Sequence, residues 1–384
     1  MVRPMSAEEI LAKFTEVTTA PRASLSKWKE QNKKKVIGCF PMDIPEEIIH
    51  AAGMLPVVMW EGDEPITVGH AHISPYNCGI VRSVIDDSAR GNLDVLDGIV
   101  SYETCLQARH LHFILKKTGQ YAYCQRIFLP GLVTGDAGKA FMIDNLKRLK
   151  ESLEHFGGQE ISRQSLNQSI LIYNENRSLL RKLYQLRKRN PGLLKAKEVL
   201  AIVHSSMLML KEEHNQLLHQ LLQDLETKAV KLETRARVIL SGSLCEAPQR
   251  LILDLIEEAG MVIVDDDLYV GSRYFANDAV ADGDPLVALT DRYLQRIPPS
   301  PTRIDADVDW SDTIVQMVDQ NKAAGVISLV VKYCPPHLAY YPDIERELSG
   351  AGIHALMLEV EHEVTSLEQV KTRLQAFGEA LELS

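Results

Sequence analysis

The chain has 384 residues, of which 45% are apolar and 24% are charged, and its formal net charge is −10. This length suits two domains of about 150 residues each. A negatively charged chain lacks the basic surface that nucleic-acid binding needs, and its longest apolar runs, such as VISLVV at 326–331, are too short to cross a bilayer. The N-terminus carries no apolar signal segment, so we expect a cytoplasmic protein that binds neither nucleic acid nor membrane.

Short β-branched runs alternate with helical patterns in the first third of the chain. Such alternation is typical of a parallel sheet whose strands are joined by helices. Strands are predicted over 36–40, 55–60, 97–102 and 126–131, and helices over 45–53, 80–90 and 105–119.

The pattern changes beyond Thr134. Residues 139–228 have an almost unbroken helical pattern, interrupted chiefly at Gly157-Gly158 and at Asn190-Pro191-Gly192. A second alternating series then begins, and several of its helices end at a glycine that precedes a short apolar strand. Its strands are predicted over 237–243, 261–266, 326–333 and 354–360, and its helices over 248–260, 312–325, 340–352 and the C-terminus.

These two series predict an α/β protein with two flavodoxin-like or Rossmann-like parallel-sheet domains joined by a helical insertion. We expect four regions. They are an N-terminal helical segment at 1–34, a first α/β domain at 35–138, a helical connecting region at 139–234 and a second α/β domain at 235–384. Leucines recur at helical spacing in the connecting region, and we expect part of this surface to lie over the domain crevice and part to contact a partner subunit. The alternative is that all of it packs within this chain.

The six cysteines provide the main indication of function. Cys39, Cys105, Cys245 and Cys334 each come where an apolar run stops, and Cys78 lies in a turn-rich loop. Ligands bind outside the carboxyl ends of the strands in open α/β sheets, so a crevice between the domains would collect Cys78, Cys105 and Cys334. Soft thiolates without a CxxC pair suggest an iron–sulfur cluster built from distant segments. The alternative is that these residues simply pack, as buried cysteines often do.

Two other motifs are weaker. LVTGDAGKAF at 132–141 resembles a phosphate loop, but residue 133 is not glycine and Ala140 replaces the hydroxyl residue that would hold magnesium, so we expect no nucleotide hydrolysis by this chain. Three consecutive aspartates at 265–267 could hold a metal ion, although a solvated loop or a helix cap explains them equally well. Cys124 precedes an apolar run and is expected in or beside the sheet.

Longer motifs add a family resemblance. GCFPMDIPEEIIHAAGMLPV, Asn77-Cys78, YETCLQAR, SGSLCEAPQRLILDLIEEAGMVIVDDDLYVGSRYF and VVKYCPPH together resemble the 2-hydroxyacyl-CoA dehydratase and benzoyl-CoA reductase family over nearly the whole chain beyond the first thirty residues. Within the family, the chain is most similar to the smaller core subunit, the gamma or C subunit, of the ATP-dependent reductases. Tyr269 stands where many relatives are expected to have cysteine, so a ligand from that loop is not expected.

The resemblance implies a cofactor and its ligands. It implies one [4Fe-4S] cluster between the domains, held by Cys78, Cys105 and Cys334, with an open fourth coordination site. Cys39 and Cys245 then remain occasional ligands or structural thiols. Glu47, in the PEEII motif, is nominated for a polar, catalytic role near a thioester. The alternative for Glu47 is a carboxylate favoured by the helix N-terminus.

The resemblance also implies an activity and partners. The expected function is that of a core subunit of ferredoxin-dependent benzoyl-CoA reductase, which reduces the aromatic ring of benzoyl-CoA in anaerobic aromatic degradation. The implied partners are a sister core subunit, two ATP-hydrolysing activator-type subunits that use ATP and Mg²⁺, reduced ferredoxin and the aromatic acyl-CoA. The sister core subunit is the partner expected to contact part of the leucine-rich surface. The alternatives are a 2-hydroxyacyl-CoA dehydratase subunit, which eliminates water by ketyl-radical chemistry, and a non-catalytic cluster-bearing partner.

Overall fold

The computed structural model describes residues 5–382 apart from 41–42, 60, 63, 104, 229–234, 243–247, 281, 296–299, 301, 306 and 364–366. Cys245 therefore lies outside the described residues. The described part contains two separate four-stranded sheets, and every strand pair in both is parallel. The α/β class and the two parallel sheets predicted from the sequence are confirmed.

The first sheet has the strand order β2-β1-β3-β4. Its strands are β1 (Val36–Phe40), β2 (Leu55–Val58), β3 (Gly98–Tyr102) and β4 (Tyr123–Ile127), and the helices among them are α3 (Glu46–Ala51), the short 3-10 helix η1 (Val68–Ala71), α4 (Gly79–Ala89) and α5 (Leu106–Thr118). The prediction of a strand over 126–131 was wrong in position. The strand instead includes Cys124 and ends at Ile127, where its pairing with β3 ends, and Pro130 beyond it has no N–H to continue a ladder.

The second sheet repeats this order as β6-β5-β7-β8. Its strands are β5 (Ala236–Gly242), β6 (Met261–Asp266), β7 (Gly325–Val331) and β8 (His354–Val360), and its helices are α10 (Arg250–Glu258), the 3-10 helix η2 (Ser272–Phe275), α11 (Pro285–Leu294), α12 (Trp310–Asn321), α13 (Pro335–Gly350) and α14 (Leu367–Glu382). Helix α11 was not predicted. Its signals were present, because Asp284 caps it and Pro285 occupies its first turn.

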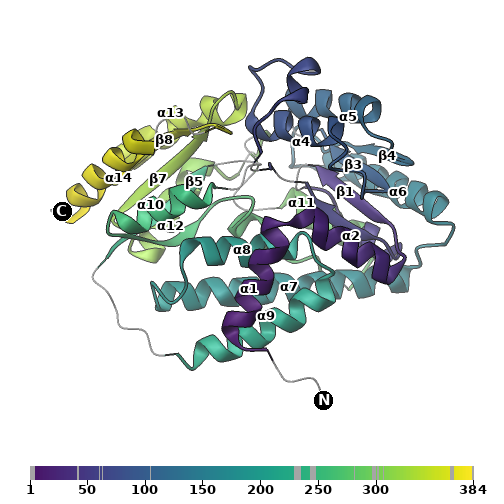
Figure 1. Ribbon diagram of the computed structural model, residues 1–384, viewed down its shortest axis with the longest axis horizontal. Coiled ribbons are helices and arrows are strands. Elements are labelled where there is room, and N and C mark those ends of the chain that lie inside the picture. The colour runs from purple at the N-terminus through teal and green to yellow at the C-terminus, as the bar shows by residue number, and fades with distance from the viewer. Residues whose placement is uncertain are drawn as a thin grey trace.

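The remaining helices come before the first sheet and between the two sheets in the sequence. They are α1 (Ala7–Thr19), α2 (Pro21–Asn32), α6 (Asp136–Gly157), α7 (Arg163–Arg189), α8 (Ala196–Ser206) and α9 (Lys211–Glu226). In Figure 1 the sheets stand side by side above α7, α8 and α9, and α1 crosses α8 and α9. The expected breaks are confirmed, since α6 ends before Gly158 in a left-handed conformation and α7 ends before Asn190.

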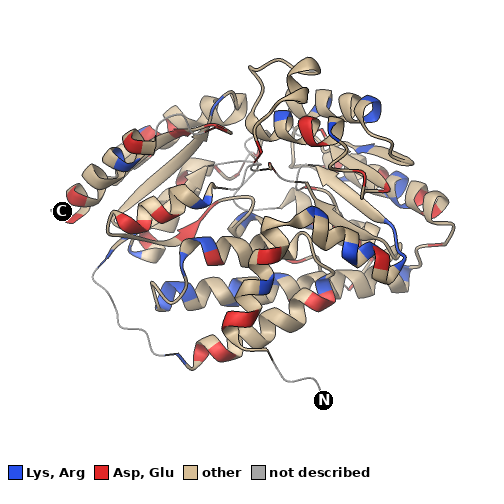
Figure 2. Cartoon of the chain, in the orientation of Figure 1, with Lys and Arg blue, Asp and Glu red and all other residues tan. Residues whose placement is uncertain are grey.

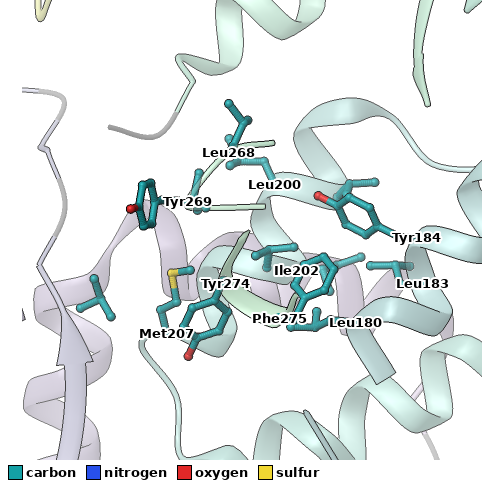
Figure 3. Packing of buried hydrophobic residues seen from close by; sticks show 14 of the residues in the cluster. Leu180, Leu183, Tyr184, Leu200, Ile202, Met207, Leu268, Tyr269, Tyr274 and Phe275 are labelled. Carbon is teal, nitrogen blue, oxygen red and sulfur yellow. The ribbon is translucent and has the colours of Figure 1, made fainter. Parts of the chain in front are cut away.

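The leucine-rich faces of these helices point into the protein. Leu180, Leu183, Leu218, Leu221 and Leu222 are at most 1% exposed. Figure 3 shows Leu180 and Leu183 of α7 beside Phe275, which belongs to the second α/β half. These five leucines are therefore packed within the chain and are not available to a partner subunit. They close the core beneath both sheets, because a long amphipathic helix buries its apolar stripe on the nearest apolar surface.

Charges are distributed over the outside of these elements. Figure 2 shows acidic and basic residues mixed along the outer helices. None of the described helices combines the length and the apolar character that a membrane span requires.

Candidate cysteine crevice

Three cysteines lie at corresponding structural positions. Cys78, Cys105 and Cys334 are the N-cap residues of α4, α5 and α13, and each is partly buried. Cys105 follows β3 and Cys334 follows β7, the third strands of two sheets that share one strand order. In each sheet the strand order reverses between the first strand and the third, and open α/β sheets bind ligands at the carboxyl ends of the strands beside such a reversal. Helix N-termini also carry partial positive charge, which favours thiolates.

The glutamine side chain of Gln107 connects all three cysteine loops. Gln107 lies in the first turn of α5, two residues after Cys105. Its Oε1 accepts a hydrogen bond from the backbone N–H of Cys78 at 2.9 Å. Its Nε2 donates to the backbone carbonyl of Tyr333, the residue before Cys334, at 2.8 Å. The structure therefore brings together the loops of the three cysteines that the sequence analysis selected.

Other contacts join the same segments from the two α/β halves. The rings of Tyr76 and Tyr333 meet edge to face with their centroids 5.6 Å apart. Arg82 of α4 reaches Glu361 beyond β8 at 3.3 Å, and Glu361 also pairs with Lys332 at 2.8 Å. These links hold the cysteine loops of the two halves together, and we call their junction the cysteine crevice.

The cysteine crevice suits an iron–sulfur cluster, because its possible ligands are thiols and come from separate loops. Three thiols on separate loops match the soft ligands of an iron–sulfur cluster. Within the described ranges, however, no three His, Cys, Asp or Glu side chains are close enough together to hold a metal ion. The loops are adjacent, but binding would require the three thiol groups to move closer together.

The remaining described cysteines have different surroundings. Cys39 lies within β1 and is fully buried, and burial, followed by the nearby Glu46, raises the pKa of its thiol well above the usual range. Cys124 is partly buried in β4, and burial raises its pKa. Both environments favour the neutral thiol, whereas a metal ligand must be a thiolate. Tyr269, at the position expected to be cysteine in relatives, is buried and donates to Ser300 Oγ at 3.2 Å.

Glu47 lies in a buried ion pair. It is the second residue of α3, and its carboxylate accepts a hydrogen bond from Arg177 of α7. Burial acts to raise the pKa of Glu47, but Arg177 and Arg292 outweigh it and hold the pKa below its usual range. Glu47 is therefore kept ionised. The sequence could not indicate this partner, because Arg177 lies 130 residues away on the connecting helices.

Glu46 takes part in a second buried network beside the first. Tyr274 donates to its two carboxylate oxygens at 2.9 and 3.1 Å, and Lys211 donates to the Tyr274 hydroxyl at 2.6 Å. Burial raises the pKa of Glu46 and lowers that of Lys211. Both glutamates line a cavity of about 10 Å³, which holds about one water molecule. The adjacent carboxylates of PEEII thus have opposite pKa shifts, which only their three-dimensional surroundings decide.

The aspartate run is not a metal site in this structure. Asp265 pairs with Lys188 at 2.5 Å, Asp266 accepts from the Tyr184 hydroxyl at 2.5 Å, and Asp267 accepts from Trp310 Nε1 at 2.5 Å. All three carboxylates are buried. Both interpretations drawn from the sequence, a metal site and a solvated loop or cap, were wrong, because each carboxylate is used to fix a neighbouring element to the end of β6.

Comparisons with known proteins agree with the motif pattern. The family model of the 2-hydroxyglutaryl-CoA dehydratase D-component matches residues 41–381. The C subunit of benzoyl-CoA reductase from Thauera aromatica is 31% identical over 93% of this chain and 93% of its own length. The (R)-phenyllactyl-CoA dehydratase beta subunit of Clostridium sporogenes is 27% identical over 98% of this chain and 100% of its own. The lactoyl-CoA dehydratase beta subunit of Anaerotignum propionicum is 29% identical over 97% and 99%.

Proposed function

Because the chain belongs to the 2-hydroxyglutaryl-CoA dehydratase D-component family, we propose that it is a core subunit of a multi-subunit enzyme that acts on acyl-CoA thioesters. The observation that carries this proposal is the meeting of the Cys78, Cys105 and Cys334 loops at one crevice, through Gln107. Relatives that align over nearly the full length of the chain are themselves named as subunits of reductases and dehydratases. The surface that contacts the sister core subunit is then to be sought outside the buried leucine stripes.

For the cofactor, we propose one [4Fe-4S] cluster held by Cys78, Cys105 and Cys334. When bound, it would supply one-electron chemistry and an open coordination site. The protein contributes three helix N-termini that favour negative charge and the contacts that hold the loops together across the crevice. Of the other candidates, Cys245 lies outside the described residues, and the raised thiol pKa of Cys39 argues against it as a ligand, as does that of Cys124 for the remaining described cysteine.

For the reaction, we propose benzoyl-CoA reduction driven by reduced ferredoxin, with ATP and Mg²⁺ used by two separate activator-type subunits. The support is the 31% identity to a benzoyl-CoA reductase subunit. Dehydration of a 2-hydroxyacyl-CoA is a second candidate, because dehydratase beta subunits align over an even larger share of this chain. The two reactions differ in net electron use, and this difference separates them experimentally.

For Glu47, a polar role near the thioester stays a prediction. Arg177 and Arg292 keep its pKa below the usual range, so it is available as a charged hydrogen-bond acceptor. Its burial in the ion pair supports the structural alternative equally.

The test is anaerobic purification of the chain with its co-purifying subunits, followed by two assays. Reductase activity predicts consumption of benzoyl-CoA with stoichiometric oxidation of ferredoxin. Dehydratase activity predicts conversion of a 2-hydroxyacyl-CoA with only catalytic amounts of reductant. Iron analysis should give about four iron per cluster in the wild type. Cys78→Ser, Cys105→Ser and Cys334→Ser should each lose it, with Cys124→Ser as the matched control. Retention of the cluster by all three variants, or zinc in place of iron, would contradict the ligand assignment.

A further inference from the structure

The side-chain amide of Gln107 forms hydrogen bonds with two different loops, accepting one and donating the other. The acceptor, Oε1, holds the backbone N–H of Cys78 at 2.9 Å, and the donor, Nε2, holds the carbonyl of Tyr333 at 2.8 Å. The side chain is partly buried, and its own backbone belongs to the helix that Cys105 caps. One residue therefore fixes one point on each of the three cysteine loops.

Each of the neighbouring contacts joins fewer of the three cysteine loops. The ring contact of Tyr76 with Tyr333 joins the Cys78 loop to the Cys334 loop but leaves out Cys105. The Arg82 to Glu361 ion pair joins α4 to the segment after β8. Gln107 alone among these three contacts includes all three cysteine loops, and it links loops that come from different sheets.

The link requires a side chain with both an acceptor and a donor. A backbone N–H can only donate and a carbonyl can only accept, and the amide of Gln107 supplies one acceptor and one donor at this position. Glutamate has the same length and keeps the acceptor for Cys78, but as a carboxylate it cannot donate to Tyr333. Methionine has a similar length and offers neither a donor nor more than a weak acceptor.

We propose that Gln107 is a positioning residue that sets the spacing of the Cys78, Cys105 and Cys334 loops before any metal arrives. This inference rests on the proposed function in one respect, which is that these three thiols are the cluster ligands. Gln107 itself coordinates nothing. It acts by holding two loops of the first half and one loop of the second half in one arrangement, from which the thiols approach a common ligand.

The first test is hydrogen exchange on the full-length chain without iron. Gln107→Met should speed exchange in peptides covering 77–84 and 331–340, by roughly 2- to 10-fold, as expected for the loss of single neutral hydrogen bonds. Gln107→Glu should speed exchange only in 331–340, because Cys78 keeps its acceptor. Gln159→Met is the matched control, since the side-chain amide of Gln159 also donates to a distant backbone carbonyl, that of Ala52, which lies outside the three cysteine loops. Unchanged exchange in both peptides of Gln107→Met would overturn the proposal.

The second test is anaerobic reconstitution with ferrous iron and sulfide. Gln107→Met should lose iron to a chelator about 10-fold faster than the wild type, and Gln107→Glu should shift the electron paramagnetic resonance signal of the reduced cluster while the protein stays folded. Wild-type rates and spectra in both variants would overturn the positioning role. If the wild type itself binds no iron, the proposed function fails, and the exchange experiment still decides whether Gln107 spaces the loops.

Discussion

Replacing Arg177 with methionine should destabilise the protein more than most single substitutions, because it would leave the Glu47 carboxylate buried without its ion-pair partner, with only the more weakly acting Arg292 nearby. The Arg177 and Glu47 side chains are only 4% and 1% exposed, so water screens neither charge. Removing one partner of such a pair costs about 3–5 kcal/mol. Arg177 also donates to Asn174 Oδ1 at 2.5 Å, and that bond would be lost as well.

In Arg177→Met, the pH dependence of the contribution that Glu47 makes to stability should also change sign. In the wild type the pKa of Glu47 lies below its ordinary value of 4.5. A carboxyl group of this kind adds stability above the ordinary pKa, and that stability is lost as the pH falls through the lowered value. Without Arg177, burial should raise the pKa of Glu47 above its ordinary value. The contribution of Glu47 should then improve, rather than fall, as the pH is lowered from about 7 to about 5.

Thermal unfolding of the full chain, followed by circular dichroism, measures both effects. At about 1.2 °C per kcal/mol for a chain of this length, Arg177→Met should melt roughly 4–6 °C below the wild type. The double variant Glu47→Gln, Arg177→Met should melt higher than Arg177→Met, because it removes the uncompensated charge. Arg346→Met is the control, since Arg346 is 68% exposed in its pair with Asp343 and should leave the melting temperature near that of the wild type. A melting temperature of Arg177→Met within about 2 °C of the wild type, or a lower one for the double variant, would refute the reasoning.

Three further results are expected. Burial acts to lower the pKa of His362, but Glu61 outweighs it and raises the pKa. The pair therefore stabilises the protein below the ordinary pKa of 6.5, and its contribution is lost as the pH rises through the raised pKa. His362→Gln should flatten this part of the plot of stability against pH, and an unchanged plot would speak against it. Asp267→Ala should cost about 3–5 kcal/mol in urea unfolding, because it removes the carboxylate that faces the buried Arg273; a loss below about 1 kcal/mol would argue against this role. Purified alone, the chain should release no phosphate from ATP, because Ala140 replaces the magnesium-binding hydroxyl residue; steady hydrolysis by the chain alone would contradict this.

The strands and crossover helices could be predicted because they depend on short-range patterns. The strand predicted over 354–360 matches β8 residue for residue, and Gly260 and Gly352 correctly marked the strands that follow them, whereas Gly325 is itself the first residue of β7. The position of β4 could not be predicted as well, because its residues Tyr123–Ile127 mix polar and apolar side chains at the edge of the sheet. Their assignment depends on pairing with β3, which no local pattern contains.

By itself, the sequence determined that two parallel-sheet units exist and that thiols follow their strands, because alternation and turn chemistry are local properties of the chain. Its motifs also indicated the family, which the comparisons confirm. Only the tertiary structure decided which groups meet. Gln107 carries no recognisable motif and became informative because folding sets it between Cys78 and Tyr333. The glutamates of PEEII are adjacent in sequence, yet Glu47 meets Arg177 while Glu46 meets Tyr274 and Lys211. Partners that lie more than a hundred residues apart are chosen by how the layers pack, and this choice sets the charge of each buried group.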